Sequence, residues 1–330
     1  MTSIKSGENL SLTNKKMLSV QELIKRIASE KDKVLKEEYN AEGLVRLQEV
    51  AATYEGEDKL VWSYDLLKEI KDRPKIEAHQ TNLIRLDEIT GGFKEQQLIT
   101  LSGSTGHGKT TMGLFMVRQF ESLSPVIIPL EQSNEEIITQ LSENNYPVPR
   151  FLSPKQNADR VTPEWVELRV VEGVAKYNTK FVVIDHLGYI KTPESQQREN
   201  LAFRIGETMR SLKAIAKRWD VIIFLLVHIS QHDEGKPPSI EDIKNSSDIS
   251  QESDTVMTIW VKNSLKKKVR VYENKAMVSV LKNRRTGRKG NVGLVFDTTT
   301  GLYHEDNAWV ESMERSAQQQ VDTDNEFDSL

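Results

Sequence analysis

Residues 103–110, Gly-Ser-Thr-Gly-His-Gly-Lys-Thr, match the phosphate-binding pattern G-x-x-x-x-G-K-[ST]. The apolar run Leu98–Leu101 precedes them and a helical pattern over 112–120 follows, which is the strand, loop and helix order that the pattern requires. In that order, free backbone N–H groups and the positive end of the helix face a bound phosphate. The segment therefore predicts an α/β fold with a phosphate site at the end of a strand.

The residues of this loop differ in what they offer a nucleotide. The glycines allow backbone conformations and close approaches that side chains block. Lys109 supplies a mobile charge for the β- and γ-phosphates, and the Thr110 hydroxyl can ligate Mg²⁺. An accidental glycine-rich turn is the alternative, and the flanking strand and helix argue against it. We expect the nucleotide to contact Gly103, Ser104, Thr105, Gly106, His107, Gly108, Lys109, Thr110 and Thr111.

Composition limits the classes of protein to which the chain can belong. Of 330 residues, 37% are hydrophobic and 28% are charged, which is typical of a globular protein. No apolar run approaches the length of a membrane span, and the polar N-terminus lacks the apolar core of a secretory signal. The absence of cysteine excludes disulfides, thiolate catalysis and cysteine-based zinc sites. These features predict a cytoplasmic protein without a membrane partner.

Charge is distributed unevenly along the chain. The net charge is −4, but residues 305–330 hold eight acids and one base, a charge of −7, so that residues 1–304 carry +3. A nucleic acid responds to local basic surface rather than to net charge. The mildly basic body therefore leaves nucleic-acid binding open.

The chain divides into three regions by pattern. Residues 1–75 contain two amphipathic helical patterns, over about 20–39 and 60–71. Residues 76–305 alternate strand and helix signals, which predicts a mainly parallel twisted sheet flanked by helices. Residues 306–330 are acidic, and we expect a disordered tail. The expected strands are Leu98–Leu101, Val126–Leu130, Phe181–Ile184, Val221–Val227, Val256–Val261, Val278–Leu281 and Val292–Phe296.

Polar residues follow several of these strands, and ligands of parallel sheets bind at the carboxyl ends of the strands. Asp185 follows four apolar residues, and its carboxylate would hold Mg²⁺ opposite Thr110. Glu131 could orient and deprotonate an attacking water, or it could be an acid at the start of the next helix. His228 could contact the γ-phosphate or that water, or it could be structural.

Two basic residues, Lys282 and Arg284, follow the strand expected over 278–281, and we expect them at the same edge of the sheet. They could reach into the ATP site of a neighbouring subunit as arginine-finger groups. The alternatives are a solvated basic hairpin and a contact with a phosphate backbone. We interpret His107 and His186 as incidental.

The stretch from about 82 to 305 resembles the C-terminal ATPase domain of DnaB-type replicative helicases, a hexameric RecA-like group. Four segments carry the resemblance. They are Leu86–Phe93 (LDEITGGF), Ile184–Leu187 (IDHL), Asp242–Asp254 (DIKNSSDISQESD) and the Lys-x-Arg triplet Lys282–Arg284.

The resemblance implies a RecA-like P-loop ATPase core that uses ATP and Mg²⁺ and forms a homo-hexameric ring on single-stranded DNA. It also implies catalytic roles for Lys109, Glu131, His228, Lys282 and Arg284, the last two acting on the neighbouring subunit's ATP. DNA would be held by Lys244, Asn245, Ser246 and Ser247 in a pore-facing loop. Two positions depart from bacterial members: His228 stands where they carry glutamine, and Ser247 stands where glycine is usual.

Several alternatives remain open at the level of sequence. The function could be that of a RecA-like recombination ATPase or of a replication scaffold that does not unwind DNA. The helix over 60–71 could dock on an adjacent subunit or pack on its own core. Possible protein partners are primase, a helicase loader or, through the acidic tail, a DNA polymerase.

Overall fold

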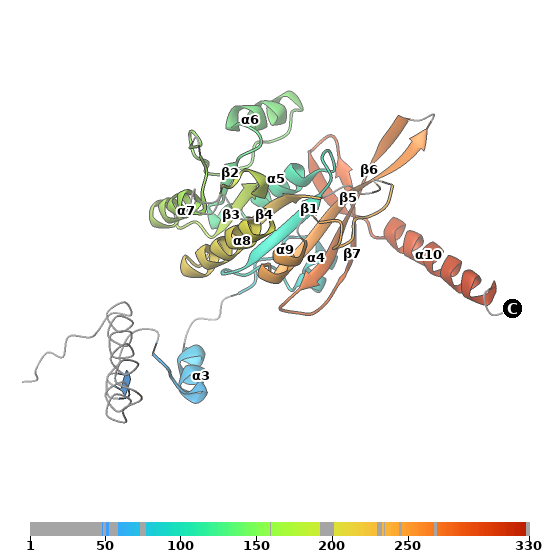
Figure 1. The fold of residues 1–330 in the computed structure, drawn as a ribbon. Coiled ribbons are helices and arrows are strands. Elements are labelled where there is room, and N and C mark those ends of the chain that lie inside the picture. Colours follow the sequence, from blue (N-terminus) through green and yellow to red (C-terminus); the bar gives the residue numbers. More distant parts are fainter. Residues whose placement is uncertain are drawn as a thin grey trace, which may run out of the picture. The chain divides into compact units, whose positions relative to one another are not determined.

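The chain forms two units, Met1–Lys75 and Ile76–Leu330, in a computed structural model (Figure 1). In the first unit, helix α3 (Ser63–Asp72) corresponds to the helix expected over 60–71, and none of its residues is buried. The helix expected over 20–39 lies outside the described residues. The structure describes residues 48, 51–52, 59–72, 77–158, 160–191, 201–229, 233, 235–243, 246–266 and 269–327.

The second unit is built on an eight-stranded sheet with the order β2-β3-β4-β1-β5-β6-β7-β8. Strands β2, β3, β4, β1 and β5 pair in parallel, and β5 to β8 pair antiparallel. The strands are β1 (Leu98–Gly103), β2 (Val126–Pro129), β3 (Phe181–Asp185), β4 (Ile222–His228), β5 (Thr255–Lys266), β6 (Val269–Asn283), β7 (Gly290–Asp297) and β8 (Leu302–Glu305).

Strand β1 lies in the middle of the parallel part, between β4 and β5. All six of its residues are buried, as expected for a strand covered on both faces. Its register places Leu98 beside Ile223 at one end and Gly103 beside His228 at the other. The carboxyl ends of β1 and β4 therefore bring the phosphate loop and His228 to the same edge.

Helices cover both faces of the sheet (Figure 1). One hydrophobic core joins α4 and α5 to one face, and a second core joins α7, α8 and α9 to the opposite face. This two-sided burial explains the continuous apolar runs of the parallel strands. The helices of this unit are α4 (Ile84–Thr90), α5 (Lys109–Gln119), α6 (Asn134–Glu143), α7 (Pro163–Tyr177), α8 (Leu201–Arg218), α9 (Ser246–Glu252) and α10 (Ala308–Phe327).

The C-terminal segment differs from the disordered tail expected over 306–330. Helix α10 begins at Ala308, and its first turns bury Val310 against Trp260 and Met277. This contact could not be predicted from the acidic composition of the segment, because only Val310 and its neighbours Trp309 and Met313 supply the apolar surface. Within the part of the chain that the structure describes, no helix has both the length and the apolar character needed to cross a membrane.

Candidate active site

The loop from Gly103 to Thr110 joins the buried strand β1 to helix α5. Gly106 and Gly108 both adopt a left-handed conformation with φ of +81°, which glycine reaches without strain. At Gly108 a Cβ atom would lie 2.7 Å from the Tyr303 hydroxyl oxygen. Glycine is therefore required at this position both by conformation and by space.

Lys109, the first residue of α5, is held inside the loop. Its side chain is buried, and its Nζ donates hydrogen bonds to the carbonyl oxygens of Gly103 (2.9 Å) and Ser104 (3.0 Å). Burial lowers the pKa of the Lys109 ammonium, and the nearby carboxylates of Asp185 and Glu131 oppose that shift. These contacts hold the Lys109 charge where the loop would receive a phosphate.

Thr110 and Asp185 form the pair that the sequence predicts for Mg²⁺. The Thr110 hydroxyl donates to Asp185 Oδ2 at 2.6 Å. Burial raises the pKa of the Asp185 carboxyl, and the hydrogen bond from Thr110 opposes this rise. Asp185 Oδ1 is buried without a hydrogen-bond partner among the described residues. A hydroxyl and a carboxylate with an unpartnered buried oxygen fit a hard divalent cation such as Mg²⁺.

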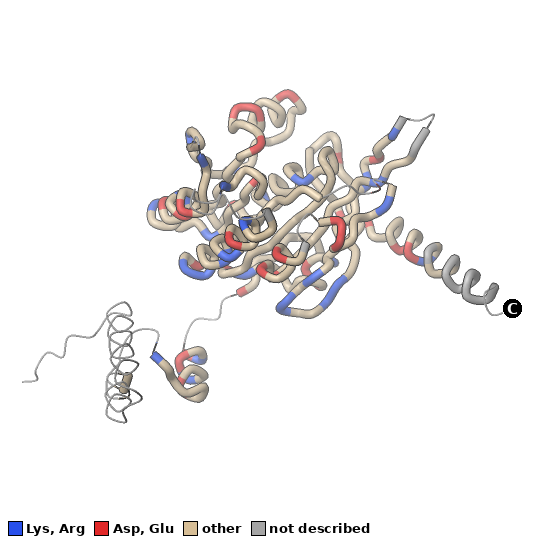
Figure 2. The backbone as a smooth tube through the Cα atoms, viewed as in Figure 1, with Lys and Arg blue, Asp and Glu red and all other residues tan. Residues whose placement is uncertain are grey.

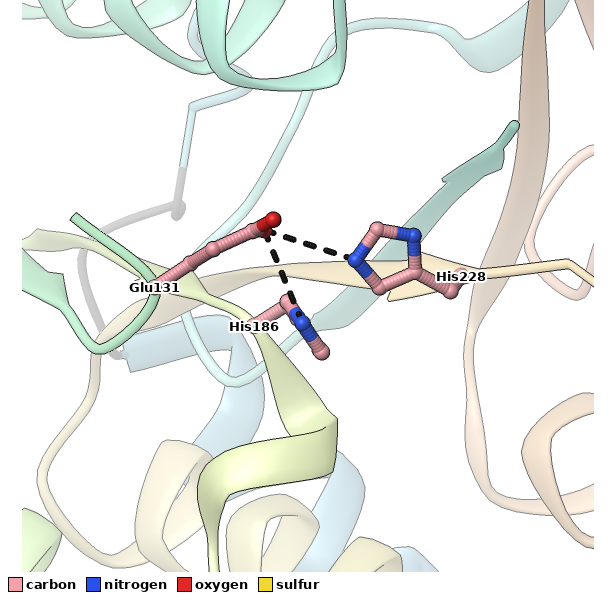
Figure 3. Close-up of side chains that lie close together, drawn as sticks. All are labelled: Glu131, His186 and His228. Carbon is pink, nitrogen blue, oxygen red and sulfur yellow. Dashed lines mark hydrogen bonds and ion pairs between the residues drawn. The ribbon is translucent and has the colours of Figure 1, made fainter. Parts of the chain in front are cut away.

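Glu131 lies two residues after the end of β2 and points between two histidines (Figure 3). Its Oε2 is 3.4 Å from Nε2 of His228 and 3.6 Å from Nε2 of His186. Ser133 and Glu136 form the capping box of α6, so Glu131 does not cap that helix. The carboxylate of Glu131 is therefore available at the same edge as the phosphate loop.

The surroundings at this edge favour the neutral form of both histidines. Burial, together with the neighbouring His228, lowers the pKa of His186 to about 4. Burial also lowers the pKa of His228, as does the charge of Lys109. The sequence interpretation of His186 as incidental missed its contact with Glu131. That contact follows from the pairing of β2 with β3 and of β3 with β4, which apolar runs do not reveal.

A cavity of about 410 Å³ lies against the loop. Lys109, Thr110, Glu131 and His228 all line it, so the expected phosphate, metal and water-activating groups meet in one space. Its far end is formed by residues that sequence reasoning missed, because they come from distant segments. Those residues include Arg118, Gln140, Tyr146, Phe296 and Leu302.

Three residues of the loop do not line the cavity, namely Gly103, Ser104 and His107. The His107 side chain is buried, and its Nδ1 accepts a hydrogen bond from the backbone N–H of Val261 at 3.0 Å. The ring also packs edge-on against Tyr272. A nucleotide could therefore meet His107 only through its backbone.

Lys282 and Arg284 do not lie at the edge where we expected them. Strand β6 runs antiparallel to β5, so its carboxyl end faces the opposite edge of the sheet. There the Arg284 backbone N–H donates to the Asp254 carbonyl oxygen, and Lys282 Nζ donates to the Ser253 carbonyl oxygen, at 2.7 and 2.9 Å. The length of β1, about 16 Å at ~3.3 Å per residue, separates this edge from the phosphate loop.

Of the expected DNA-binding residues, Lys244 and Asn245 lie outside the described residues. Ser246 begins helix α9 and Ser247 is exposed in its first turn. The body of α9 is fixed by Ile249, which is buried in the core that also holds α8. Ser247 therefore reaches the surface from a helix that is anchored in that core.

Comparisons with known proteins agree with this architecture. The family model of the DnaB-like helicase C terminal domain matches residues 78–158 and 155–305. The chain is 26% identical over 277 residues to replicative DNA helicase DnaB of Geobacillus stearothermophilus, and 23% identical over 276 residues to replicative DNA helicase DnaC of Bacillus subtilis (strain 168). Each alignment covers 72% of this chain and 59% of the relative.

Two solved structures share the fold. A DnaB-like replicative helicase, described with its interactions with primase, superposes with a TM-score of 0.60 at 16% identity, over 86% of this chain and 76% of that chain. A second structure, of an ATPase domain, superposes with a TM-score of 0.58 at 18% identity, over 73% of this chain and 95% of that chain. The expected α/β class with a RecA-like core is therefore confirmed. The chain belongs to the family of the DnaB-like helicase C-terminal domain.

Proposed function

We propose that this chain is the ATP-hydrolysing motor of a replicative DNA helicase, a homo-hexameric ring that translocates on single-stranded DNA and unwinds the duplex. The chain spans about three fifths of the curated helicases to which it is similar. The observation that carries the proposal is the meeting of Lys109, Thr110, Glu131 and His228 around one cavity. Phosphate binding, metal binding and water activation are the parts that nucleotide hydrolysis needs.

ATP would lie along the cavity with its phosphates on the loop. The backbone N–H groups of the loop and Lys109 would hold the β- and γ-phosphates. Thr110 and Asp185 would hold Mg²⁺, which when bound neutralises charge on the β- and γ-phosphate oxygens. The aromatic and polar far end, with Tyr146 and Phe296, has the character of a site for the nucleoside.

Glu131 would take the proton of the attacking water. Its carboxylate is close enough to the loop to lie in the same cavity as Lys109, and no helix cap competes for it. His228, at the end of β4 beside Gly103, would contact the γ-phosphate or the water. Burial lowers the pKa of His228, which favours the neutral ring, and a neutral ring would act by hydrogen bonding.

Lys282 and Arg284 would act on the ATP of an adjacent subunit. In their own chain they lie at the sheet edge opposite the phosphate loop, which is compatible with action across a subunit boundary. The turn that follows them is rich in basic residues, with Arg285, Arg288 and Lys289 (Figure 2). Of these basic residues, only Lys282 and Arg284 are proposed to stabilise the charge of the transferring phosphoryl group.

Single-stranded DNA would be held by Lys244, Asn245, Ser246 and Ser247. Ser247 is exposed, and small side chains allow the DNA backbone to approach the N–H groups closely. Primase, a helicase loader or a DNA polymerase would be the protein partners of the assembled ring.

The direct test is the ATPase rate of the purified chain with Mg²⁺, with and without single-stranded DNA, together with strand separation on a forked duplex. We expect DNA to raise the rate and unwinding to depend on ATP, with Lys109→Ala inactive in both assays. A rate that does not respond to DNA would favour the scaffold alternative. ATP-dependent strand exchange without unwinding would favour the recombination ATPase.

A further inference from the structure

His186 lies beside Glu131 because the ends of β2 and β3 are joined by backbone hydrogen bonds. The N–H groups of Leu130 and Glu131 both donate to the Asp185 carbonyl oxygen, at 2.5 and 3.0 Å. His186 is the next residue after Asp185, so its ring starts from a point fixed relative to Glu131. Only 12% of the His186 side chain is exposed.

The His186 ring is held in one orientation. It packs edge-on against Tyr189 and against His228, with ring centroids 4.9 and 4.0 Å apart. Gly188 leaves room for the ring, since a Cβ atom at Gly188 would lie 2.7 Å from the Cε1 atom of His186. The position of Nε2 is therefore set by packing rather than by chance contact with Glu131.

One hydrogen bond fixes which nitrogen of His186 carries the proton. The backbone N–H of Gly188 donates to Nδ1 of His186 at 3.0 Å, so Nδ1 is the unprotonated nitrogen. The neutral ring then carries its hydrogen on Nε2, the atom that faces Glu131 Oε2 at 3.6 Å (Figure 3). Catalytic hydrogen bonds are often long before the substrate binds and shorten in the complex.

We propose that His186 is a positioning residue for ATP hydrolysis, donating its Nε2 hydrogen to Glu131 Oε2. A donor on Oε2 fixes the rotation of the carboxylate and leaves Oε1 to accept the proton of the attacking water. The inference rests on the proposed function, because it gives Glu131 the role of base. It adds to that function a residue which touches neither nucleotide nor water.

The same three side chains also have the composition of a metal site. Ligand atoms of Glu131, His186 and His228 lie within 4.8 Å of one another, and two imidazoles with a carboxylate suit zinc or iron. Nε2 of His186 could bind a metal only if its hydrogen moved to Nδ1. That hydrogen would then face the N–H of Gly188, donor against donor. The tautomer therefore favours a hydrogen bond to Glu131 over a metal.

Two substitutions separate the hydrogen bond from the ring. His186→Phe keeps a ring and removes the donor, whereas His186→Gln keeps a donor near the position of Nε2. We expect His186→Phe to lower kcat for ATP about tenfold, as for loss of a hydrogen bond to a charged group, with KM within about twofold. His186→Gln should retain most of kcat. A wild-type kcat in His186→Phe, or an equal loss in both variants, would overturn the proposal.

A double-mutant cycle tests whether His186 acts through Glu131. In a Glu131→Gln background, His186→Phe should have no further effect on the residual rate, because the carboxylate that it orients is gone. The same tenfold loss in both backgrounds would contradict the proposal. Thermal unfolding of each variant checks that the variant is folded at the temperature at which its ATPase rate is measured.

The tautomer can be measured without any activity. The wild-type chain is labelled with ¹⁵N on its six histidines, and the signal that is missing in His186→Gln is assigned to His186. We expect the ¹⁵N NMR spectrum to show the hydrogen of His186 on Nε2. An Nδ1–H tautomer overturns the inference even if ATPase activity is present. A chain that has the Nε2–H tautomer and hydrolyses no ATP overturns the proposed function, and with it the role of His186.

Discussion

At the scale of single residues, the burial of Asp185 suits its carboxylate to cation binding and also lowers the stability of the fold when that carboxylate is ionised. Its carboxylate is buried, one oxygen accepts from Thr110, and the other has no partner among the described residues. Taking a charged group out of water disfavours its ionised form unless partners replace the water. The same unpartnered oxygen is what makes Asp185 suited to a cation.

The stability of the chain without nucleotide and Mg²⁺ should therefore depend on pH through Asp185. Its pKa in the folded chain is raised above 3.8, so the folded state binds the proton more tightly than the unfolded state. Protonation thus stabilises the fold as pH falls, and this stabilisation is lost as pH rises through the folded pKa. Asp185→Asn carries no titrating group at this position.

We expect the stability of Asp185→Asn relative to the wild type to decrease as pH is lowered from about 7 toward 3.8, the ordinary pKa of the group. The measurement is thermal unfolding of both chains across that range, in a chelating buffer without nucleotide. The other acids are common to both chains and cancel in the difference. If Asp185→Asn instead gained stability relative to the wild type as pH fell, Asp185 would be stabilised as a carboxylate.

The sequence predicted much of the site residue by residue, for a physical reason. A glycine-rich loop and acids placed directly after apolar runs depend on local order, so the position of Lys109, Thr110, Asp185 and Glu131 at one edge of the sheet could be predicted. The contact of His186 with Glu131 could not be predicted, because it depends on which strands are neighbours, and its ring orientation depends on a hydrogen bond from Gly188. The residues at the far end of the cavity carry no local pattern at all.

At the scale of elements, strand direction was the information that apolar runs did not contain. Each of the seven expected strands is present. The run around Val278–Leu281 was recognised as a strand, but it belongs to β6, which returns antiparallel to β5. This direction moves Lys282 and Arg284 to the opposite edge. Strand β8 was missed because its sequence, Leu-Tyr-His-Glu, is short and half polar.

Helix α10 provides an element-scale prediction about the segment expected to be disordered. Val310 is fully buried against Trp260 and Met277, on the antiparallel half of the sheet. Val310→Ala should lower the free energy of unfolding by about 2 kcal/mol, from two lost methyl groups and the cavity that they leave. Urea unfolding followed by tryptophan fluorescence measures the change.

The matched control is the same substitution at Val271, which is 40% exposed in β6. Val271→Ala should change the free energy of unfolding by less than about 0.5 kcal/mol. If Val310→Ala lowered the free energy of unfolding no more than Val271→Ala does, α10 would contribute no packing to the sheet.

At the scale of the whole molecule, the distance between Arg284 and the cavity bears on the proposed assembly. Glu131 and Lys109 line the cavity, whereas Arg284 is held beside Asp254 at the far edge of the same sheet. A rigid sheet does not allow Arg284 to reach the cavity of its own chain. If Arg284 takes part in hydrolysis, its partner is the nucleotide of another copy.

Mixing wild-type chains with Arg284→Ala chains, at constant total concentration and with Mg²⁺, ATP and single-stranded DNA, tests this sharing most directly. Arg284→Ala alone should lose about 10³-fold in ATPase rate, as for an arginine finger. Arg288→Ala, in the same exposed turn, is the control and should keep its activity. We predict that an equal mixture retains well under half of the wild-type rate, because each altered chain disables a site on its neighbour. A rate that falls only in proportion to dilution, or a monomer that hydrolyses ATP at the full rate, would contradict the account.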